Sequence, residues 1–247
     1  MSAAHAALAA EIADCRRCPR LVEWREQVAR VKRASFAHEE YWGRPIPGFG
    51  DLSARVLVLG LAPAAHGANR TGRVFTGDRS GDFLFAALHR AGYANQPEAV
   101  SLDDGLRLRD CFITAAVRCA PPANKPLPSE KAACAHWLAR ELALLEHVRV
   151  VVCLGAFAWT AALTTPAVLG GPAPRPRPPF GHAAEYVART GSGTVLARTL
   201  LGCFHPSQQN TFTGKLTEPM IDAVLARAGE LAVQERCLTP FLQETRS

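Results

Sequence analysis

Three short, mostly apolar runs, separated by segments of helical periodicity, constrain the fold of this chain more than any other feature. They are residues 55–60, 111–117 and 148–154. A strand that is buried on both faces of a parallel sheet is apolar along its length, and the intervening helices cover the two faces. The pattern therefore predicts an α/β protein with a parallel sheet.

The rest of the chain divides into expected helices, one further strand region and two loops. Residues 194–204 suggest a last strand or strand pair, and residues 43–51 and 166–182 are loops rich in Pro and Gly. Helical spacing covers residues 3–33 (interrupted at 15–19), 83–90, 129–146, 156–163 and 217–233, with Ser129 as a candidate N-cap. No repeat and no linker divides residues 1–247, which we expect to form one domain.

The balance of charges permits an acidic partner without identifying one. Lys and Arg number 28 and Asp and Glu number 22, which gives a net charge of +6. The first ten residues lack the cationic start of an export signal, so we expect a cytoplasmic protein whose eight cysteines are reduced thiols or metal ligands. The stretch 150–175 is uncharged until its last residue, but Gly155, Pro166 and residues 170–172 break it, and no membrane contact is expected.

Four of the cysteines have the spacing of a sulfur ligand set. Cys15 and Cys18 form a C-x2-C pair, Cys119 follows the second apolar run, and Cys134 lies fifteen positions later. Four thiolates in two groups suit zinc or an iron–sulfur cluster, and spacing alone does not decide between them. Of the others, three lie within apolar strands as expected core residues and one stands alone near the C-terminus: Cys111, Cys153, Cys203 and Cys237.

In a parallel α/β sheet, ligands bind beyond the carboxyl ends of the strands, so the loops that follow the strands are candidate sites. The first run leads into residues 60–67, whose small residues and proline allow a ligand to approach the backbone closely. A Gly-rich turn over 70–78 follows, where Asp78 or Ser80 could cap the next helix. After the last strand, His205 precedes a largely polar, uncharged segment that suits phosphate oxygens or base edges.

Together, the two loops and the four cysteines resemble the uracil-DNA glycosylase superfamily, most closely its family 5, the iron–sulfur type with a broad range of bases. Residues 60–67 are similar to the first motif of this superfamily, and residues 205–211 are similar to its second. The order of elements agrees over most of the chain. The positions that match the ligands of a 4Fe-4S cluster in families 4 and 5 are Cys15, Cys18, Cys119 and Cys134.

The resemblance implies a three-layer α/β/α sandwich with a parallel four-stranded central sheet, and it implies a DNA repair enzyme. Such an enzyme flips uracil or another deaminated base out of double- or single-stranded DNA. It then hydrolyses the N-glycosidic bond and leaves an abasic site without nicking the strand. We expect a monomer that acts on the nucleoid, with the cluster as a structural staple because the hydrolysis needs no electron. A redox-sensing role stays open.

The resemblance also assigns roles to individual residues. Phe75 matches the position that stacks on the flipped base, and His205 matches the residue that donates to pyrimidine O2 as negative charge grows there. The residues that match positions holding the nucleotide are Gly60, Ala62, Pro63, Ala64 and His66, and those that match positions contacting phosphate or wedging into the gap are Ser207, Gln208 and Asn210.

The chain departs from sister families at two places. Where they carry a carboxylate or amide that positions the attacking water, this chain has Leu61 and Ala62. Asp78 and Asn124 are then the nearest polar candidates for catalysis, and Asp78 could cap a helix as well. Ala115 stands where sister families place an Asn that reads the uracil edge. A site without that reader rejects analogues weakly, so we expect activity on hypoxanthine or etheno bases too.

Two other interpretations remain open. A non-catalytic nucleic-acid-binding module organised by zinc would explain the net charge, the four cysteines and the arginines at 16, 17, 175 and 177. It would not explain why two polar motifs stand at strand ends. A family 4 glycosylase limited to uracil is the closer alternative, and Ala115 together with Leu61 and Ala62 argues against it.

Overall fold

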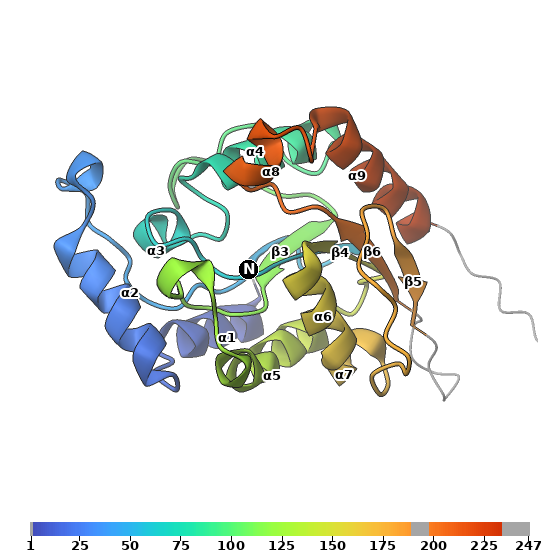
Figure 1. Cartoon of the computed structure of the whole chain (residues 1–247), viewed down its shortest axis with the longest axis horizontal. Helices are drawn as coiled ribbons and strands as arrows, with labels where there is room; N and C mark the ends of the chain where they lie inside the picture. The colour runs from blue at the N-terminus through green and yellow to red at the C-terminus, as the bar shows by residue number, and fades with distance from the viewer. Residues whose placement is uncertain (1, 189–197, 234–247) are drawn as a thin grey trace, which may run out of the picture.

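A mixed sheet of six strands lies at the centre of residues 2–188 and 198–233, the part of the chain that the computed structural model describes (Figure 1). Its strands are β1 (Phe49–Gly50), β2 (Val56–Gly60), β3 (Cys111–Ala115), β4 (Val150–Leu154), β5 (Glu185–Val187) and β6 (Thr199–Cys203). Their order across the sheet is β1-β3-β2-β4-β6-β5. The pairs among β3, β2, β4 and β6 are parallel, whereas β1 and β5 pair antiparallel at the edges.

The predicted α/β class is confirmed, but the predicted parallel four-stranded central sheet is only part of a mixed six-stranded sheet, because the two antiparallel edge strands were missed. β1 has 2 residues and β5 has 3, which is too short for a hydrophobic period to be visible in the sequence. Within the predicted strand region 194–204, residues 199–203 form β6. Residues 194–197 and Cys237 lie outside the described part of the chain.

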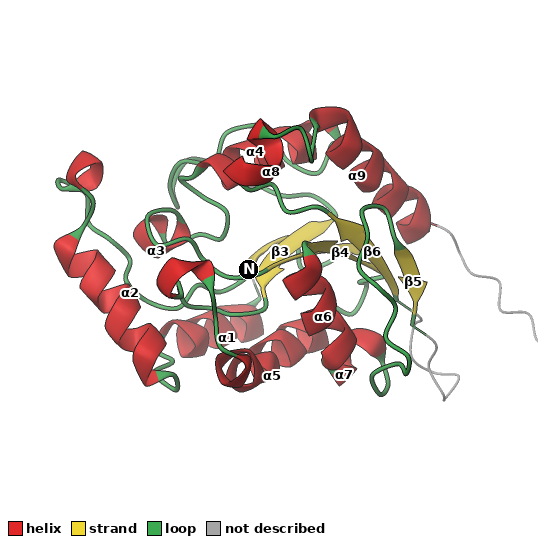
Figure 2. Ribbon diagram, in the orientation of Figure 1, coloured by secondary structure: helices red, strands yellow, loops and turns green. Residues whose placement is uncertain are grey.

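Helices cover both faces of the sheet (Figure 2). They are α1 (Ala3–Ala13), α2 (Pro19–Val31), α3 (Ala68–Thr71), α4 (Arg79–Arg90), α5 (Pro128–Leu144), α6 (Ala156–Thr164), α7 (Pro166–Leu169), α8 (Gln208–Phe212) and α9 (Glu218–Val233), with short 3-10 turns at Ala34–Phe36 and Pro122–Asn124. In Figure 1, α4 and α9 lie above the sheet and α5, α6 and α7 lie below it. The described residues therefore form three layers.

Alternate residues of each central strand face opposite layers, which explains the continuous apolar runs. Val56 and Val58 of β2 belong to the core under α4 and α9, and Leu57 and Leu59 belong to the core above α5 and α6. All four side chains are fully buried. Burying one such side chain contributes about 1.5–3 kcal/mol, so each central strand stabilises both layers.

The parallel register brings the carboxyl ends of the strands to one edge of the sheet. Gly60 at the end of β2 pairs with Ala115 at the end of β3, and Leu154 at the end of β4 pairs with Cys203 at the end of β6. The loops that leave β2, β3 and β6 therefore begin at the same edge of the sheet, as the strand pattern predicts.

Two helices begin earlier in the chain than the sequence indicates. α4 starts at Arg79 rather than at 83, because the Asp78 carboxylate accepts hydrogen bonds from the first free amides of the helix. α5 starts at Pro128, so the prediction of Ser129 as its N-cap is wrong. Proline suits the first helical position, and Glu130 accepts a hydrogen bond from the Leu127 amide at 2.7 Å in place of a hydroxyl cap.

The uncharged stretch 150–175 is divided among several elements. It contains β4, α6, α7 and part of the loop that leads to β5. No helix within residues 2–188 and 198–233 combines the length and the apolar character needed to cross a membrane.

A buried ion pair fastens α5 to the sheet. Arg118, just beyond β3, donates to both oxygens of Glu141 of α5, at 2.7 and 2.6 Å. The same carboxylate accepts from the Thr114 hydroxyl at 2.7 Å and from the Gly48 amide at 2.8 Å. The arginine and the glutamate are almost completely buried, so their charges depend on each other.

We expect Glu141→Ala to lower the free energy of unfolding by about 3–5 kcal/mol, because the substitution leaves the Arg118 guanidinium buried and unpaired. Urea denaturation followed by circular dichroism measures this change. Glu11→Ala is the matched control, since it removes an exposed pair with Arg140 and should cost at most about 1 kcal/mol. Equal losses in the two variants would contradict the role assigned to the buried pair.

Candidate active site and thiol group

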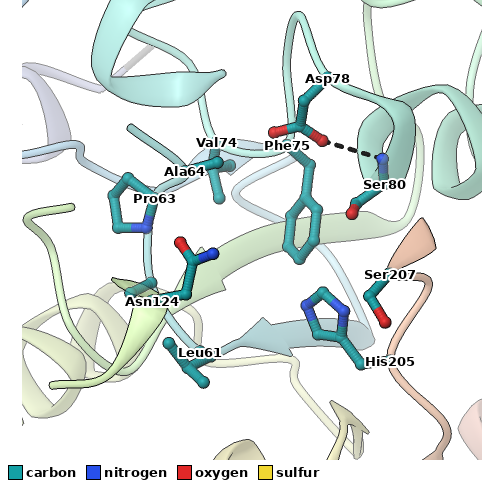
Figure 3. Close-up of a pocket in the computed structure, with 11 residues that line it drawn as sticks. Leu61, Pro63, Ala64, Val74, Phe75, Asp78, Ser80, Asn124, His205 and Ser207 are labelled. Carbon is teal, nitrogen blue, oxygen red and sulfur yellow. Dashed lines mark hydrogen bonds between the residues drawn. The ribbon is translucent and has the colours of Figure 1, made fainter. Parts of the chain in front are cut away.

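A cavity of about 240 Å³ opens at the edge where the strands end. Figure 3 shows that its lining comes from the loop after β2, the turn before α4, the segment after β3 and the loop after β6. The lining residues are Leu61, Ala62, Pro63, Ala64, Val74, Phe75, Asp78, Ser80, Asn124, His205 and Ser207. The volume is below the roughly 300–1,000 Å³ of typical small-molecule sites, so the cavity suits a small group rather than a drug-sized ligand.

The Phe75 ring forms one wall of the cavity and depends on a glycine. Phe75 has a φ of 53°, an uncommon conformation for a non-glycine residue, and its ring packs on the Cα of Gly60. A Cβ at Gly60 would lie 2.7 Å from Cε2 of Phe75, which is too close for the ring to stay in place. Gly60 therefore shapes the cavity without lining it.

His205 lies next to Phe75, with the two ring centroids 6.1 Å apart and the planes tilted by 36°. Its backbone carbonyl accepts a hydrogen bond from Nδ2 of Asn210 at 2.8 Å, which holds the loop after β6. Burial lowers the pKa of His205 to about 4, so the imidazole is neutral at neutral pH. A neutral imidazole still carries one N–H, which can donate to an oxygen in the cavity.

Asp78 caps α4 and lines the cavity at the same time. Its Oδ1 accepts from the amides of Ser80 at 2.9 Å and Gly81 at 3.0 Å. Its Oδ2 lies against Gly67, where an added Cβ would come within 2.1 Å of that oxygen. Burial raises the pKa of Asp78, although the two amide bonds oppose this shift. The helix cap therefore uses only Oδ1, and Oδ2 stays available to interact with another group.

The structure brings most of the sequence-predicted site residues together. Ala62, Pro63, Ala64, Asn124 and Ser207 line the cavity with Phe75, Asp78 and His205. Asn124 has a φ of 55° and belongs to the short turn after β3. In Figure 3 the Asn124 amide projects into the cavity from the side opposite Phe75.

Besides Gly60, three of the predicted contact residues lie outside the lining of this cavity. His66 and Gln208 line a neighbouring polar pocket that also includes Asp78 and Asn124. The His66 ring shares a hydrogen bond with the Tyr41 hydroxyl at 3.1 Å. The Asn210 amide braces the His205 carbonyl, so this side chain has a structural partner.

Besides Leu61, two lining residues, Val74 and Ser80, were not predicted as part of the site. Ser80 was considered only as a helix cap, and the structure gives that role to Asp78. Both residues flank the stretch from Phe75 to Asp78, so their closeness in sequence was the signal that could have identified them.

The four spaced cysteines lie in one group. Cys15 and Cys18 stand between α1 and α2, Cys119 follows β3, and Cys134 lies on α5. They share a small apolar cluster with residues such as Trp137. Burial raises the pKa of the Cys119 thiol to about 12 and also raises that of Cys134. Without a metal these thiols stay neutral, which is compatible with their apolar surroundings.

Among the described side chains, no three of His, Cys, Asp or Glu converge in the way that ligands surround a single metal ion. The sulfur of Cys119 accepts a hydrogen bond from Nη1 of Arg25 at 2.9 Å.

The predicted core cysteines are confirmed, because Cys111, Cys153 and Cys203 are completely buried in β3, β4 and β6.

The depressed pKa of His205 predicts a specific loss of stability in acid. Between pH 6.5 and about 4, the unfolded chain binds a proton at this position that the folded protein does not bind, so stability falls as the pH falls. The contribution is at most about 3 kcal/mol. We expect His205→Gln to lose less stability over this range in urea titrations than the unsubstituted protein does. An exposed control, His38→Gln, should follow the unsubstituted protein, and an unchanged slope in His205→Gln would contradict the burial of a neutral imidazole.

The family model of the uracil DNA glycosylase superfamily matches residues 47–229, which contain every residue of the cavity. A type-5 uracil-DNA glycosylase of Mycobacterium tuberculosis is 56% identical over 226 residues, covering 91% of this chain and 81% of the relative. That of Thermus thermophilus is 52% identical and covers 88% of this chain and 94% of the relative.

A type-4 uracil-DNA glycosylase of Thermotoga maritima is similar over a shorter segment. It is 33% identical over 114 residues, which is 46% of this chain and 51% of the relative. The similarity to type-5 enzymes thus extends over nearly twice as much of the chain. The family match, the long type-5 matches and the cavity at the strand ends agree, and the chain belongs to the uracil DNA glycosylase superfamily.

Proposed function

We propose that this protein is a DNA repair glycosylase that removes uracil and other deaminated bases from DNA by hydrolysis of the N-glycosidic bond. It leaves an abasic site and does not cut the strand. The observation that carries the proposal is a small cavity with Phe75 and a neutral His205 side by side on its wall, in a chain of this superfamily. We further propose that it acts as a monomer in the cytoplasm, on double- and single-stranded DNA.

A base inside a duplex is out of reach of the cavity, so the nucleotide must rotate outward first. This costs a few kcal/mol, and less when the base is mismatched, as uracil is opposite guanine. Stacking of a base on an aromatic ring contributes about 1–3 kcal/mol and offsets part of the cost. Phe75 offers such a ring, and the loop over Ala62, Pro63 and Ala64 gives the sugar a wall with little side-chain bulk.

Cleavage of the glycosidic bond leaves negative charge on the departing base and positive charge on the sugar. The N–H of neutral His205 donates to the pyrimidine O2 as that charge develops. A donor that is already fixed in a water-poor site stabilises the transition state without reorganising, and removal of one such donor costs about 10²–10³ in rate. The hydrogen bond from the neutral imidazole is stronger when the base carries negative charge in the transition state than when the neutral base first binds. It therefore lowers the barrier to cleavage.

The attacking water needs an acceptor on the other side of the cavity. Oδ1 of Asp78 is committed to α4, and Oδ2 is the oxygen that can orient the water and accept its proton. Asn124 projects into the same space and can hold the water or the sugar. Leu61 and Ala62, which line the cavity where sister families carry a polar group, can do neither.

The range of bases follows from what the cavity lacks. Ala115 is buried at the end of β3 and is absent from the lining, and the neighbouring walls at Leu61, Ala62 and Val74 are apolar. An apolar wall discriminates between bases by shape and rejects analogues only weakly. We therefore favour the broad type over a uracil-only enzyme, and the longer match to type-5 relatives supports the same choice.

Cys15, Cys18, Cys119 and Cys134 would hold a 4Fe-4S cluster. The fit rests on the donor set, which consists of thiols in an apolar cluster with one buried cationic donor at Cys119. Each thiolate of such a cluster binds a different iron, so the sulfurs do not need to converge on one point as they do around zinc. When bound, the cluster would cross-link the junction of α1 and α2 to α5 and to the segment after β3. The zinc-organised, non-catalytic alternative fits the site less well, because it does not explain the cavity at the strand ends.

The proposal is tested by a panel of duplexes, each with one altered base, scored for alkali-labile abasic sites. We expect release of uracil from a pair with guanine and of hypoxanthine or ethenocytosine as well. Release of uracil alone would support the uracil-only alternative, and release of nothing by iron-loaded protein would contradict the proposed function.

His205→Ala should slow single-turnover release of uracil by about 10²–10³, whereas its affinity for abasic DNA changes little. The variant removes the donor to the developing anion but keeps the surfaces that hold DNA. His38→Ala, at an exposed position, is the control. If release and abasic-DNA affinity fell by the same factor, His205 would be a contact residue only.

Asp78→Asn should keep the helix cap and lose the acceptor. Its carbonyl oxygen can still accept from Ser80 and Gly81, so we expect the midpoint of unfolding to change little while the release rate falls by about 10²–10⁴. Asp78→Ala should in addition cost about 0.5–2 kcal/mol of stability. A normal rate in Asp78→Asn would show that the residue is a cap and nothing more.

Cys119→Ala should yield colourless protein with little iron and lower solubility, because the cross-link between two segments is lost. Cys203→Ala, a buried cysteine of β6 outside the thiol group, should keep its iron. Metal analysis of anaerobically purified protein measures both. If Cys119→Ala were soluble, iron-loaded and fully active, Cys119 would not be a ligand of the cluster.

A further inference from the structure

The guanidinium of Arg25 is buried beside the thiol group. Arg25 lies on α2 and is 1% exposed. Its Nη1 donates to the Cys119 sulfur at 2.9 Å and to the backbone carbonyl of Cys15 at 3.2 Å. Arg25 therefore contacts both halves of the thiol group, the C-x2-C pair through Cys15 and the other half through Cys119. Cys119 lies 94 residues from Arg25 in the sequence.

The charge of Arg25 has no hydrogen-bonded carboxylate in the described part of the chain and only one long ion pair. The nearest, Glu26, lies 3.9 Å away and is itself hydrogen-bonded to Arg16. Arg25 Nε–H is also buried without a partner among the described atoms. A buried charge and a buried N–H are both costly when unpaired.

Arg118 shows how this protein treats a comparable cation. It is equally buried and its Nε–H likewise lacks a partner among the described atoms, but Glu141 accepts two hydrogen bonds from its other nitrogens, at 2.7 and 2.6 Å. The fold thus pairs one buried guanidinium with a carboxylate and leaves the other facing sulfur. What would complete the second site is a negative charge with further acceptors, located among the cysteines.

We propose that Arg25 is the charge partner of the iron–sulfur cluster. This inference rests on the proposed cofactor, and it makes Arg25 a positioning residue in addition to the four cysteine ligands. The guanidinium offsets the negative charge of the four thiolates and donates to the Cys119 sulfur, and Nε–H is free to donate to the cluster. Hydrogen bonds to sulfur and the charge around a cluster set its reduction potential, so Arg25 raises that potential.

The test measures the reduction potential and the iron content of anaerobically purified holoprotein. Arg25→Gln removes the charge and keeps a donor, and Arg25→Lys keeps the charge with a different geometry. Arg20→Gln is the matched control on α2, because Arg20 pairs with Glu130 and makes no contact with sulfur among the hydrogen bonds of the described residues. Circular dichroism verifies that each variant is folded.

We expect a shift to more negative potential in Arg25→Gln, a smaller shift in Arg25→Lys and none in Arg20→Gln. Loss of iron from Arg25→Gln alone would also support the proposal, since lysine retains the charge. An unchanged potential in Arg25→Gln would overturn it, and so would loss of iron or of fold in both Arg25 variants. Absence of iron from the unsubstituted protein would refute the cofactor and this inference together, whereas the base-release panel tests the glycosylase activity separately.

Discussion

The register of the parallel strands is the constraint on which the site depends. Gly60 and Ala115 end their strands side by side, and so do Leu154 and Cys203. His205 follows β6 by two residues and therefore emerges at the same edge as the loop after β2. Slipping one strand by a single residue would turn its side chains to the opposite layer, where they would not match the packing of the two cores. Core packing thus fixes the position of the loops that line the cavity.

Several residues of the site serve the fold and the chemistry together. Asp78 begins α4 with one oxygen and lines the cavity, and Asn210 holds the His205 carbonyl. The thiol group is linked to the cavity through Arg25 and Asn69. Nδ2 of Asn69 donates to the backbone carbonyl of Arg25 at 3.2 Å, and the backbone N–H of Asn69 donates to the Ala64 carbonyl at 3.1 Å. The proposed cluster, by fixing α2, would therefore also support the loop that lines the cavity.

Much of the fold and of the cavity could be predicted from the sequence, because both depend on local patterns. Apolar runs identified the central strands, small residues and a proline marked the loop after the first strand, and the resemblance to the superfamily identified Phe75. The edge strands β1 and β5 escaped because they are too short to show a period. The N-cap assigned to Ser129 was wrong because Pro128 and Glu130 begin the helix without a hydroxyl.

Other features depend on contacts that no local pattern records. Gln208 begins α8, and this helix directs it to the neighbouring polar pocket rather than to the base cavity. The pairing of Arg25 with Cys119 and that of Arg118 with Glu141 join segments far apart in the chain. Which buried arginine receives a carboxylate and which receives a sulfur is decided by packing alone.

The most direct measurement is a structure of the protein with a duplex that contains one 2′-fluorinated deoxyuridine, whose glycosidic bond resists cleavage. We expect the uracil ring to leave the helix and lie against Phe75. Its O2 should be within about 2.7–3.2 Å of a His205 ring nitrogen. A uracil that stays stacked in the duplex, or one that occupies another pocket, would contradict the account.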